Sequence, residues 1–157
     1  MNKYKTDMLA RFEEAVATFP NETQQAPRAD STVLRLLSWN LFMFQRCQEW
    51  QHLLPIIQDH APDILCFQEV DRTSTLFQPF VEYLQSMGFS TNFAISFSTA
   101  DRNEGILLCT KGRAEDCHTI PLAGNRTALV ASFQGISVVC LHLDAQDLSG
   151  KLRTLQL

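Results

Sequence analysis

Polar side chains follow two apolar runs that have the length and composition of buried β-strands. Asn40 follows the run that begins at Val33, and Glu69 comes soon after the run Ile64–Phe67. Between them, the segment Trp50–Ile57 repeats apolar residues at helical spacing, so the order is strand, helix, strand. This order predicts two parallel strands joined by a right-handed crossover. Asn40 and Glu69 are therefore expected at the same edge of one sheet.

An amide oxygen beside a single carboxylate suits Mg²⁺, which takes one or two carboxylates and keeps waters that phosphate oxygens can replace. On position alone, however, such a pair is more often a cap or a solvated loop. His142 ends a later strand, where an imidazole can donate a proton or a hydrogen bond to a leaving oxygen. A hydrogen bond to a nearby carbonyl is the alternative, which position alone favours. The other histidines are expected on the surface or at helix ends: His52, His60 and His118.

Further elements follow from the periodicity of apolar residues and from the positions of Pro and Gly. Thr6–Phe19 is predicted to be an amphipathic helix, and residues 21–31 a linker that follows Pro20. Pro55 lies inside the helix that ends near residue 60, so that helix either kinks or starts later than Trp50. The remaining predicted elements are a helix at Leu76–Met87 ended by Gly88, strands at Phe89–Phe97 and Gly105–Cys109, a hairpin of Thr127–Phe133 and Ile136–Leu141 around Gln134-Gly135, and a helix beginning in Leu148–Leu157.

Composition places the chain among globular proteins. Its 157 residues are 45% hydrophobic and carry a formal net charge of −4, which allows one domain with a real core. The acidic balance excludes the broad basic surface of a non-specific nucleic-acid binder. It does not exclude local phosphate binding through a metal ion and one or two arginines.

The cysteines and the N-terminus indicate a reduced, intracellular protein, either cytoplasmic or nuclear. The five cysteines include no C-x-x-C pair, which does not favour structural zinc. Three of them lie in apolar runs and are expected in the core: Cys66, Cys109 and Cys140. The stretch Met1–Thr6 has no apolar segment behind its lysines, so no signal peptide is expected. No apolar run approaches the roughly 20 residues of a membrane span.

Six short motifs occur in an order that resembles the endonuclease/exonuclease/phosphatase family, the deoxyribonuclease-I-like superfamily. They are Ser38-Trp39-Asn40-Leu41, Pro62-Asp63-Ile64-Leu65-Cys66-Phe67-Gln68-Glu69-Val70-Asp71, Glu104-Gly105-Ile106, Asn125-Arg126-Thr127, Leu141-His142-Leu143 and Lys151-Leu152-Arg153-Thr154-Leu155-Gln156. The second motif, in register with the other five, is the specific one. The resemblance runs from Val33 to Leu157. It divides the chain into an N-terminal helix and linker, residues 1–31, and a domain, residues 32–157.

The resemblance implies a Mg²⁺-dependent hydrolase of phosphate esters, with Mn²⁺ as the second candidate metal. It makes Glu69 the metal ligand and gives Asn40 the role of holding the metal or the attacking water. His142 would contact the leaving group or the phosphate. Arg126 would bind substrate, although a surface arginine in a turn is an almost equal alternative. Val70-Asp71 is similar to members that act on RNA or other nucleotide phosphodiesters, which favours nucleic acid or nucleotide over lipid or inositol phosphate.

The fold class implied is α/β (α+β), the first half of a four-layer α/β/β/α sandwich. Its sheet is expected to be mixed and mainly antiparallel, with helices on one face. The family's later motifs, Asp-x-Asn and Ser-Asp-His, are missing, so the domain is expected to be truncated at its C-terminus. The inner face of the sheet would then lack its partner and could bind another protein. A non-catalytic scaffold and one half of a split enzyme are the alternative functions.

Overall fold

The structure is a computed structural model that describes residues 3–18, 33–45, 50–99, 102–122 and 126–143. Its elements, in chain order, are α1 (Lys3–Thr18), β1 (Leu36–Asn40), the 3₁₀ turn η1 (Phe42–Phe44), α2 (Trp50–His60), β2 (Ile64–Asp71), α3 (Phe77–Ser86), β3 (Phe89–Thr99), β4 (Arg102–Lys111), β5 (Asp116–Leu122), β6 (Arg126–Phe133) and β7 (Ile136–Leu141). The helix predicted within Leu148–Leu157 lies outside the described residues. No described helix is long and apolar enough to cross a membrane.

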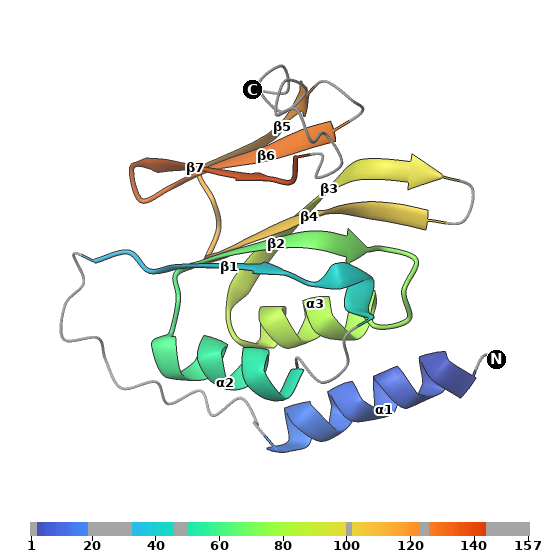
Figure 1. Cartoon of the computed structure of the whole chain (residues 1–157). Coiled ribbons are helices and arrows are strands. Elements are labelled where there is room, and N and C mark those ends of the chain that lie inside the picture. Colours follow the sequence, from blue (N-terminus) through green and yellow to red (C-terminus); the bar gives the residue numbers. More distant parts are fainter. Residues whose placement is uncertain (1–2, 19–32, 46–49, 100–101, 123–125, 144–157) are drawn as a thin grey trace.

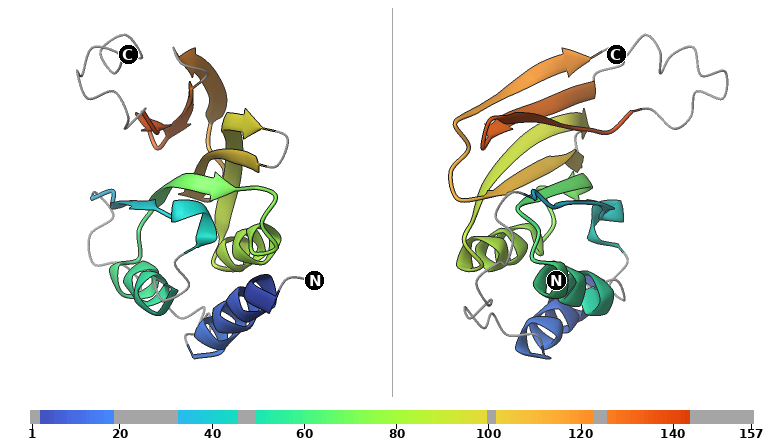
Figure 2. Two further views of the ribbon diagram at one scale, coloured as in Figure 1. Left: turned by 45° about the vertical axis from the view of Figure 1, so that its right-hand side comes forward. Right: turned by 90° about the vertical axis from the view of Figure 1, so that its left-hand side faces the viewer.

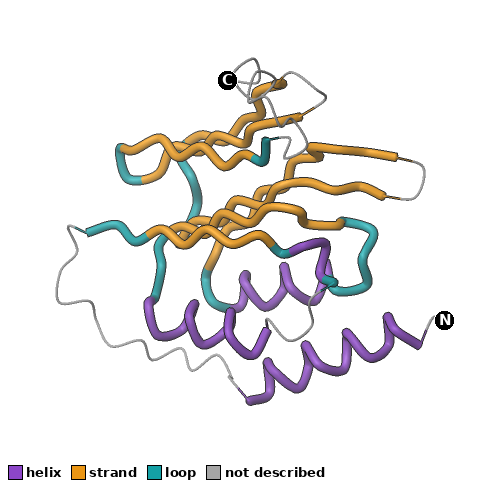
Figure 3. Tube along the Cα trace, in the orientation of Figure 1, coloured by secondary structure: helices purple, strands orange, loops and turns teal. Residues whose placement is uncertain are grey.

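The strands form two sheets, and the helices lie together on one side of the larger sheet. The larger sheet has the order β1-β2-β4-β3 and the smaller one the order β5-β6-β7. Figure 1 and the tube of Figure 3 show the helices below the larger sheet and the smaller sheet above it. The rotated views of Figure 2 keep this stacking. The α+β class, the mixed sheet and the helices on one face are confirmed.

Strand β1 runs parallel to β2, as the strand–helix–strand order predicts. The register pairs Leu36 with Ile64 and Asn40 with Gln68, so both strands end at the same edge. The other pairings within this sheet, β2 with β4 and β3 with β4, are antiparallel. Helix α2 begins at Trp50 and continues through Pro55 to His60. The later start considered for this helix is therefore wrong.

An aromatic cluster joins the helices to the larger sheet. Phe12 of α1 meets Trp50 of α2 edge-to-face, with ring centroids 5.1 Å apart, and lies 6.3 Å from Phe80 of α3. Such aromatic pairs contribute about 0.5–1.5 kcal/mol beyond their buried area. Met8, Phe12 and Ala15 are buried, which confirms that the apolar face of the first helix packs on the domain. The division of the chain at residue 31 stays a prediction.

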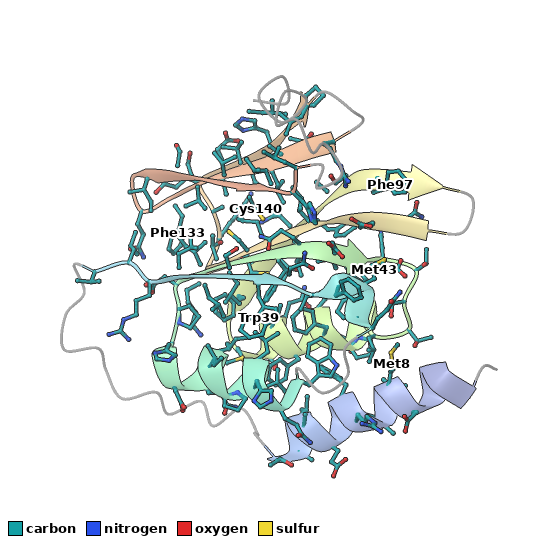
Figure 4. All side chains as sticks on the ribbon, viewed as in Figure 1. Met8, Trp39, Met43, Phe97, Phe133 and Cys140 are labelled. Carbon is teal, nitrogen blue, oxygen red and sulfur yellow. The ribbon has the colours of Figure 1, made fainter. Side chains whose placement is uncertain are left out.

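The smaller sheet covers the opposite face of the larger one along β2, β4 and β3. A second core cluster joins the two sheets: Ile64, Cys66, Ala94, Ile106 and Leu108 from the larger sheet, and Leu129, Ala131, Phe133, Val138 and Cys140 from the smaller. The prediction that this inner face lacks a partner is therefore wrong for β2, β4 and β3, whereas Leu36 of β1, which pairs with Ile64, is 53% exposed. The reason is that the hairpin folds across the larger sheet instead of extending it, and that the polar strand β5 was not recognised. Figure 4 shows Cys140 and Phe133 in the layer between the sheets.

Two turns have the backbone that their residues predict. In the hairpin of β6 and β7, Gln134 has φ 51° and Gly135 has φ 76°. Positive φ at both central residues is the pattern of a type I′ turn, whose twist matches that of the strands. Gly88 follows α3 with φ 86°, and its N–H donates to the carbonyl of Gln85. Glycine adopts this left-handed conformation without the strain that a Cβ would add.

Candidate active site

Asn40 ends β1 with both ends of its amide engaged. Its Nδ2 donates to Oε1 of Glu69 at 2.8 Å, and its Oδ1 accepts the N–H of Phe42, also at 2.8 Å. The first bond confirms that the two residues meet at the shared sheet edge. The second couples the amide to the turn η1. The side chain of Asn40 therefore holds the Glu69 carboxylate in one orientation.

The turn η1 has an uncommon backbone. Phe42, Met43 and Phe44 have φ values of 45°, 56° and 58°, all in the left-handed region. A side chain with a Cβ loses about 1–2 kcal/mol in this region. Burial of Phe44 in the aromatic cluster, stacked on Trp50 at 5.8 Å, offsets part of that strain. Strain of this kind is concentrated at functional sites, where surrounding contacts maintain it.

Glu69 lies in a bulge of β2, and the bulge accounts for its direction. The register of β2 against β4 shifts between Phe67 and Val70, and Glu69 has φ 51°. An extra residue in one strand re-aims its side chain. The Glu69 side chain is 18% exposed and points into the mouth between the two sheets, because the side chain of His142 approaches it from the smaller sheet. The bulge thus carries the carboxylate out of the regular alternation of the strand.

Gln68, beside Glu69, connects three strands. Its Nε2 donates to Oγ of Ser38 at 3.1 Å and to the Cys66 carbonyl at 3.2 Å, and lies 3.8 Å from Sγ of Cys140. These contacts join β1, β2 and β7 next to Glu69. Gln68 therefore supports the position of the carboxylate, a role that sequence reasoning did not give it.

His142 follows β7 and reaches Glu69 from the other sheet. Its Nε2 lies 3.6 Å from Oε1 of Glu69, and its side chain is 16% exposed. This separation is too long for a strong hydrogen bond, but it allows an ion pair when the imidazole is protonated. The sequence placed His142 at a strand end without saying which strand edge it would face. The structure brings it to the edge that carries Asn40 and Glu69.

Arg126 begins β6 and lies against β4 and β3. Its Nη1 is 3.7 Å from Oε1 of Glu104, and its guanidinium carbon is 5.8 Å from the ring centroid of Phe97. The side chains of Arg126 and Glu104 are 16% and 6% exposed, so this ion pair is mostly removed from water. Nη1 of Arg126 is buried without a hydrogen-bond partner among the described residues. The alternative that Arg126 is a surface arginine in a turn does not fit this degree of burial.

The donors present fit a hard cation better than zinc. Within the described part of the chain, no group of three or more His, Cys, Asp and Glu side chains is arranged to hold a metal ion. Glu69 with Asn40 supplies one carboxylate and one amide, which matches the sparse protein ligation of Mg²⁺. Asp71 is engaged locally, because its Oδ1 accepts from the backbone and the hydroxyl of Thr73. Asp71 therefore has a local structural role.

Sequence reasoning missed Glu104 and Phe97 as site residues. Glu104 lies in one of the six motifs, but no role was predicted for it. A carboxylate directly before the apolar run Gly105–Cys109 indicates a buried acid that has a partner. Phe97 gave no sequence signal, since an aromatic residue near a strand end is ordinarily core. The histidines expected on the surface are exposed: His52, His60 and His118, the last paired with Asp116 at 2.9 Å.

The cysteines expected in the core are buried: Cys66, Cys109 and Cys140. Hydrogen bonding with Cys140, together with burial, raises the pKa of the Cys66 thiol. Burial also raises the pKa of Cys109. The thiols of Cys66 and Cys109 are therefore neutral at physiological pH and act as small apolar side chains.

Comparison with solved structures identifies the fold, whereas no family model and no curated protein sequence matches the chain. An endonuclease/exonuclease/phosphatase family protein from Leptotrichia buccalis superposes with a TM-score of 0.57 at 13% identity, covering 78% of this chain and 60% of that one. The 3′ phosphatase NExo from Neisseria, bound to a product DNA hairpin, gives 0.54 at 18% identity over 78% and 49%. TDP2 from D. rerio, complexed with a single-strand DNA product, gives 0.57 at 15% identity over 77% and 50%.

This chain thus spans 49% to 60% of the length of these three structures, and most of its own length takes part in the match. Identities below 20% establish the architecture only. The chain therefore carries, over about half the extent of those structures, the DNase I-like fold of the endonuclease/exonuclease/phosphatase family.

Proposed function

We propose that this chain supplies the metal-binding half of a phosphoesterase that hydrolyses nucleic acid or nucleotide phosphate esters with Mg²⁺. The observation that carries the proposal is the meeting of two polar side chains at one carboxylate. Asn40 and His142 both contact Oε1 of Glu69, although the three residues come from β1, β2 and the end of β7. Two of these positions border strained backbone, at η1 and at Glu69 itself. The activity is proposed for a protein in which the rest of this fold is also present.

Glu69 would bind the metal ion directly. Asn40 would keep the carboxylate in place through the Nδ2–Oε1 hydrogen bond, while its amide oxygen accepts from the Phe42 N–H. Mg²⁺ at this position would stabilise charge on phosphoryl oxygens and lower the pKa of a bound water. Mn²⁺ accepts the same oxygen donors and is the second candidate.

His142 and Arg126 would contact the phosphate from the smaller sheet. The imidazole of His142 lies beside Glu69, where it can donate a hydrogen bond to a phosphoryl or leaving oxygen. The guanidinium of Arg126, whose side chain is 16% exposed, can donate to another phosphate oxygen. Donors that are held in place before the substrate arrives lose little free energy to reorganisation.

Nucleic acid or nucleotide is the favoured substrate class for two reasons. The matched Neisseria and D. rerio proteins carry DNA products, and a further matched structure, ANGEL2, holds adenosine-2′,3′-vanadate. The Val70-Asp71 sequence after the metal-binding glutamate points the same way by resemblance. A non-catalytic scaffold is less favoured, because its basis was an open inner sheet face, and the smaller sheet covers that face along β2, β4 and β3.

Hydrolysis assays with matched variants test the proposal. The natural protein that contains this chain is expected to hydrolyse a labelled oligonucleotide with Mg²⁺ and to stop when EDTA is added. Glu69→Gln keeps the shape of the side chain and removes its charge, and we expect a loss in kcat of roughly 10²–10³-fold or more. Asp71→Asn is the matched control, because Asp71 serves Thr73 and should leave kcat unchanged. Near-normal turnover of Glu69→Gln would remove Glu69 from the mechanism.

A further inference from the structure

Phe97 presents an aromatic ring at the mouth between the two sheets. Its ring lies under the guanidinium of Arg126, which comes from the smaller sheet, so it faces the inner side of β3. It is 38% exposed, whereas most large apolar side chains on the inner side are buried. Figure 4 shows Phe97 at the same end of the sandwich as Met43 of η1 and at the opposite end from Phe133. Phe97 thus lies at the end that carries Asn40 and Glu69.

The position of Arg126 over this ring depends on Glu104. Glu104 pairs with Phe97 across the β3–β4 ladder and is 5% exposed. A carboxylate buried to this degree requires a partner, and the Arg126 guanidinium lies 3.7 Å from it. Glu104 is therefore a positioning residue that keeps the guanidinium beside the Phe97 ring.

The strands that carry Phe97 and Glu69 are separated by a gap that one nucleotide can bridge. Strands β2, β4 and β3 are consecutive in the sheet, so two strand spacings, about 10 Å, separate the strands of Glu69 and Phe97. One sugar ring separates a phosphate from its base, and this linkage spans a gap of that order. A phosphate at Glu69 and His142 would therefore place an adjacent base within reach of the ring.

We propose that Phe97 and Arg126 form a subsite for one unpaired nucleobase and its neighbouring phosphate, which makes a single-stranded segment the preferred substrate. This inference rests on the proposed function and adds to it the strandedness of the substrate. The base stacks on Phe97, and the guanidinium of Arg126 donates to the phosphate. In a duplex, neighbouring bases already cover both faces of each base, so the ring is unavailable to it. The combination of an aromatic face and an adjacent cation matches a nucleotide, which has both a π-face and an anion.

Binding of oligonucleotides tests the inference separately from hydrolysis. A fluorescent single-stranded oligonucleotide would be titrated with the whole protein in EDTA, so that no cleavage occurs, and anisotropy would be followed. Phe97→Leu keeps an apolar side chain and removes the π-face, and we expect its Kd to rise roughly 5- to 150-fold, the range found for one stacked base. Phe97→Trp should restore tight binding. Ile95→Ala, at a 44% exposed position two residues earlier, is the control with unchanged Kd.

An oligonucleotide of the same length with an abasic position isolates the stacking contact. The parent protein should bind this probe more weakly than the complete strand, and Phe97→Leu should not weaken it further. The inference is overturned if Phe97→Leu binds the complete strand within twofold of the parent protein, if duplex binds as tightly as single strand, or if the parent protein binds neither. Hydrolysis lost in Glu69→Gln together with unchanged binding in Phe97→Leu would retain the proposed function and reject the subsite.

Discussion

Gly105 is expected to tolerate no side chain, because β3 approaches its backbone closely. A Cβ built at this position would lie 2.2 Å from the carbonyl oxygen of Ala94 and 2.6 Å from Cζ of Phe93. The ring can rotate away, but the carbonyl belongs to the paired strand. To reach van der Waals contact, it would have to withdraw by about 1 Å. That movement would disturb the β3–β4 ladder beside Glu104.

We expect Gly105→Ala to lower the free energy of unfolding by about 3 kcal/mol, the upper part of the range for overpacked sites. Urea unfolding, with an m value of about 2 kcal/mol/M, would show this as a midpoint lowered by about 1.5 M. Gly112→Ala is the control, because no atom lies within 4 Å of its added Cβ. That variant should lose only about 1–2 kcal/mol, since Gly112 has φ 80°.

A double variant distinguishes the two obstacles at Gly105. If the Ala94 carbonyl is the obstacle, adding Gly105→Ala to Phe93→Ala should still lower stability by more than 2 kcal/mol, roughly the loss from a strained packing site. If the ring alone blocks the methyl group, the second substitution becomes nearly neutral. The reasoning fails altogether if Gly105→Ala in the parent protein stays within about 0.5 kcal/mol of the original, the usual range for harmless surface changes.

Three other changes have expected outcomes. Phe12→Ala should lower unfolding free energy in urea by about 3–5 kcal/mol, because it opens a cavity between the helices; a negligible change would place α1 outside the core. Glu104→Gln should raise KM for a phosphodiester roughly tenfold, about 1.4 kcal/mol, and affect kcat less, since it releases Arg126; an unchanged KM would contradict this role. Burial raises the pKa of Cys109 above its ordinary value of 9.0. Because the thiol then ionises at a lower pH in the unfolded chain than in the folded one, the free energy of unfolding falls above pH 9.0, by up to about 1.4 kcal/mol per pH unit. Between pH 8 and 10, the free energy of unfolding measured in urea should decline less steeply for Cys109→Val than for the parent protein. Equal slopes would contradict this prediction.

Local patterns were sufficient to predict the parallel strand pair and its functional edge. Apolar runs around a helical segment determine the βαβ unit, and parallel strands end at a common edge, so Asn40 and Glu69 had to be neighbours. The turn chemistry of Gln134-Gly135 likewise predicted the hairpin of β6 and β7. These features depend on residues close in sequence or on one simple topological rule. They did not require knowledge of how the layers pack.

The relative placement of the two sheets could not be predicted in the same way. Alternation along β6 shows that one face is buried, but it does not say which surface buries it. That surface is the inner face of the larger sheet, and only this packing brings His142 to Glu69 and Arg126 to Glu104. Strand β5 was missed because it is polar and lies at an edge of its sheet, where Pro121 is tolerated.

The predicted partner was expected to bind the inner face of the larger sheet, and the smaller sheet occupies much of that face. The inner face of the larger sheet is covered along β2 and β4, Leu36 of β1 is exposed, and the exposed apolar residues Ile120 and Val139 lie on the outer face of the smaller sheet. Their alternation against core residues such as Cys140 places them there. Packing of the smaller sheet thus buries much of the apolar inner face that the sequence analysis had assigned to a partner protein.

Binding of Mn²⁺ to the chain itself tests the account most directly, because it does not depend on turnover. Paramagnetic Mn²⁺ would be titrated into ¹⁵N-labelled protein, and the account predicts that amide signals of Leu41, Glu69 and Val70 broaden first. Excess Mg²⁺ should reverse the broadening, and Glu69→Gln should abolish it, whereas Asp71→Asn should not. Broadening that begins elsewhere in the chain, or that is unchanged in Glu69→Gln, would contradict the assignment of Glu69 as the metal ligand.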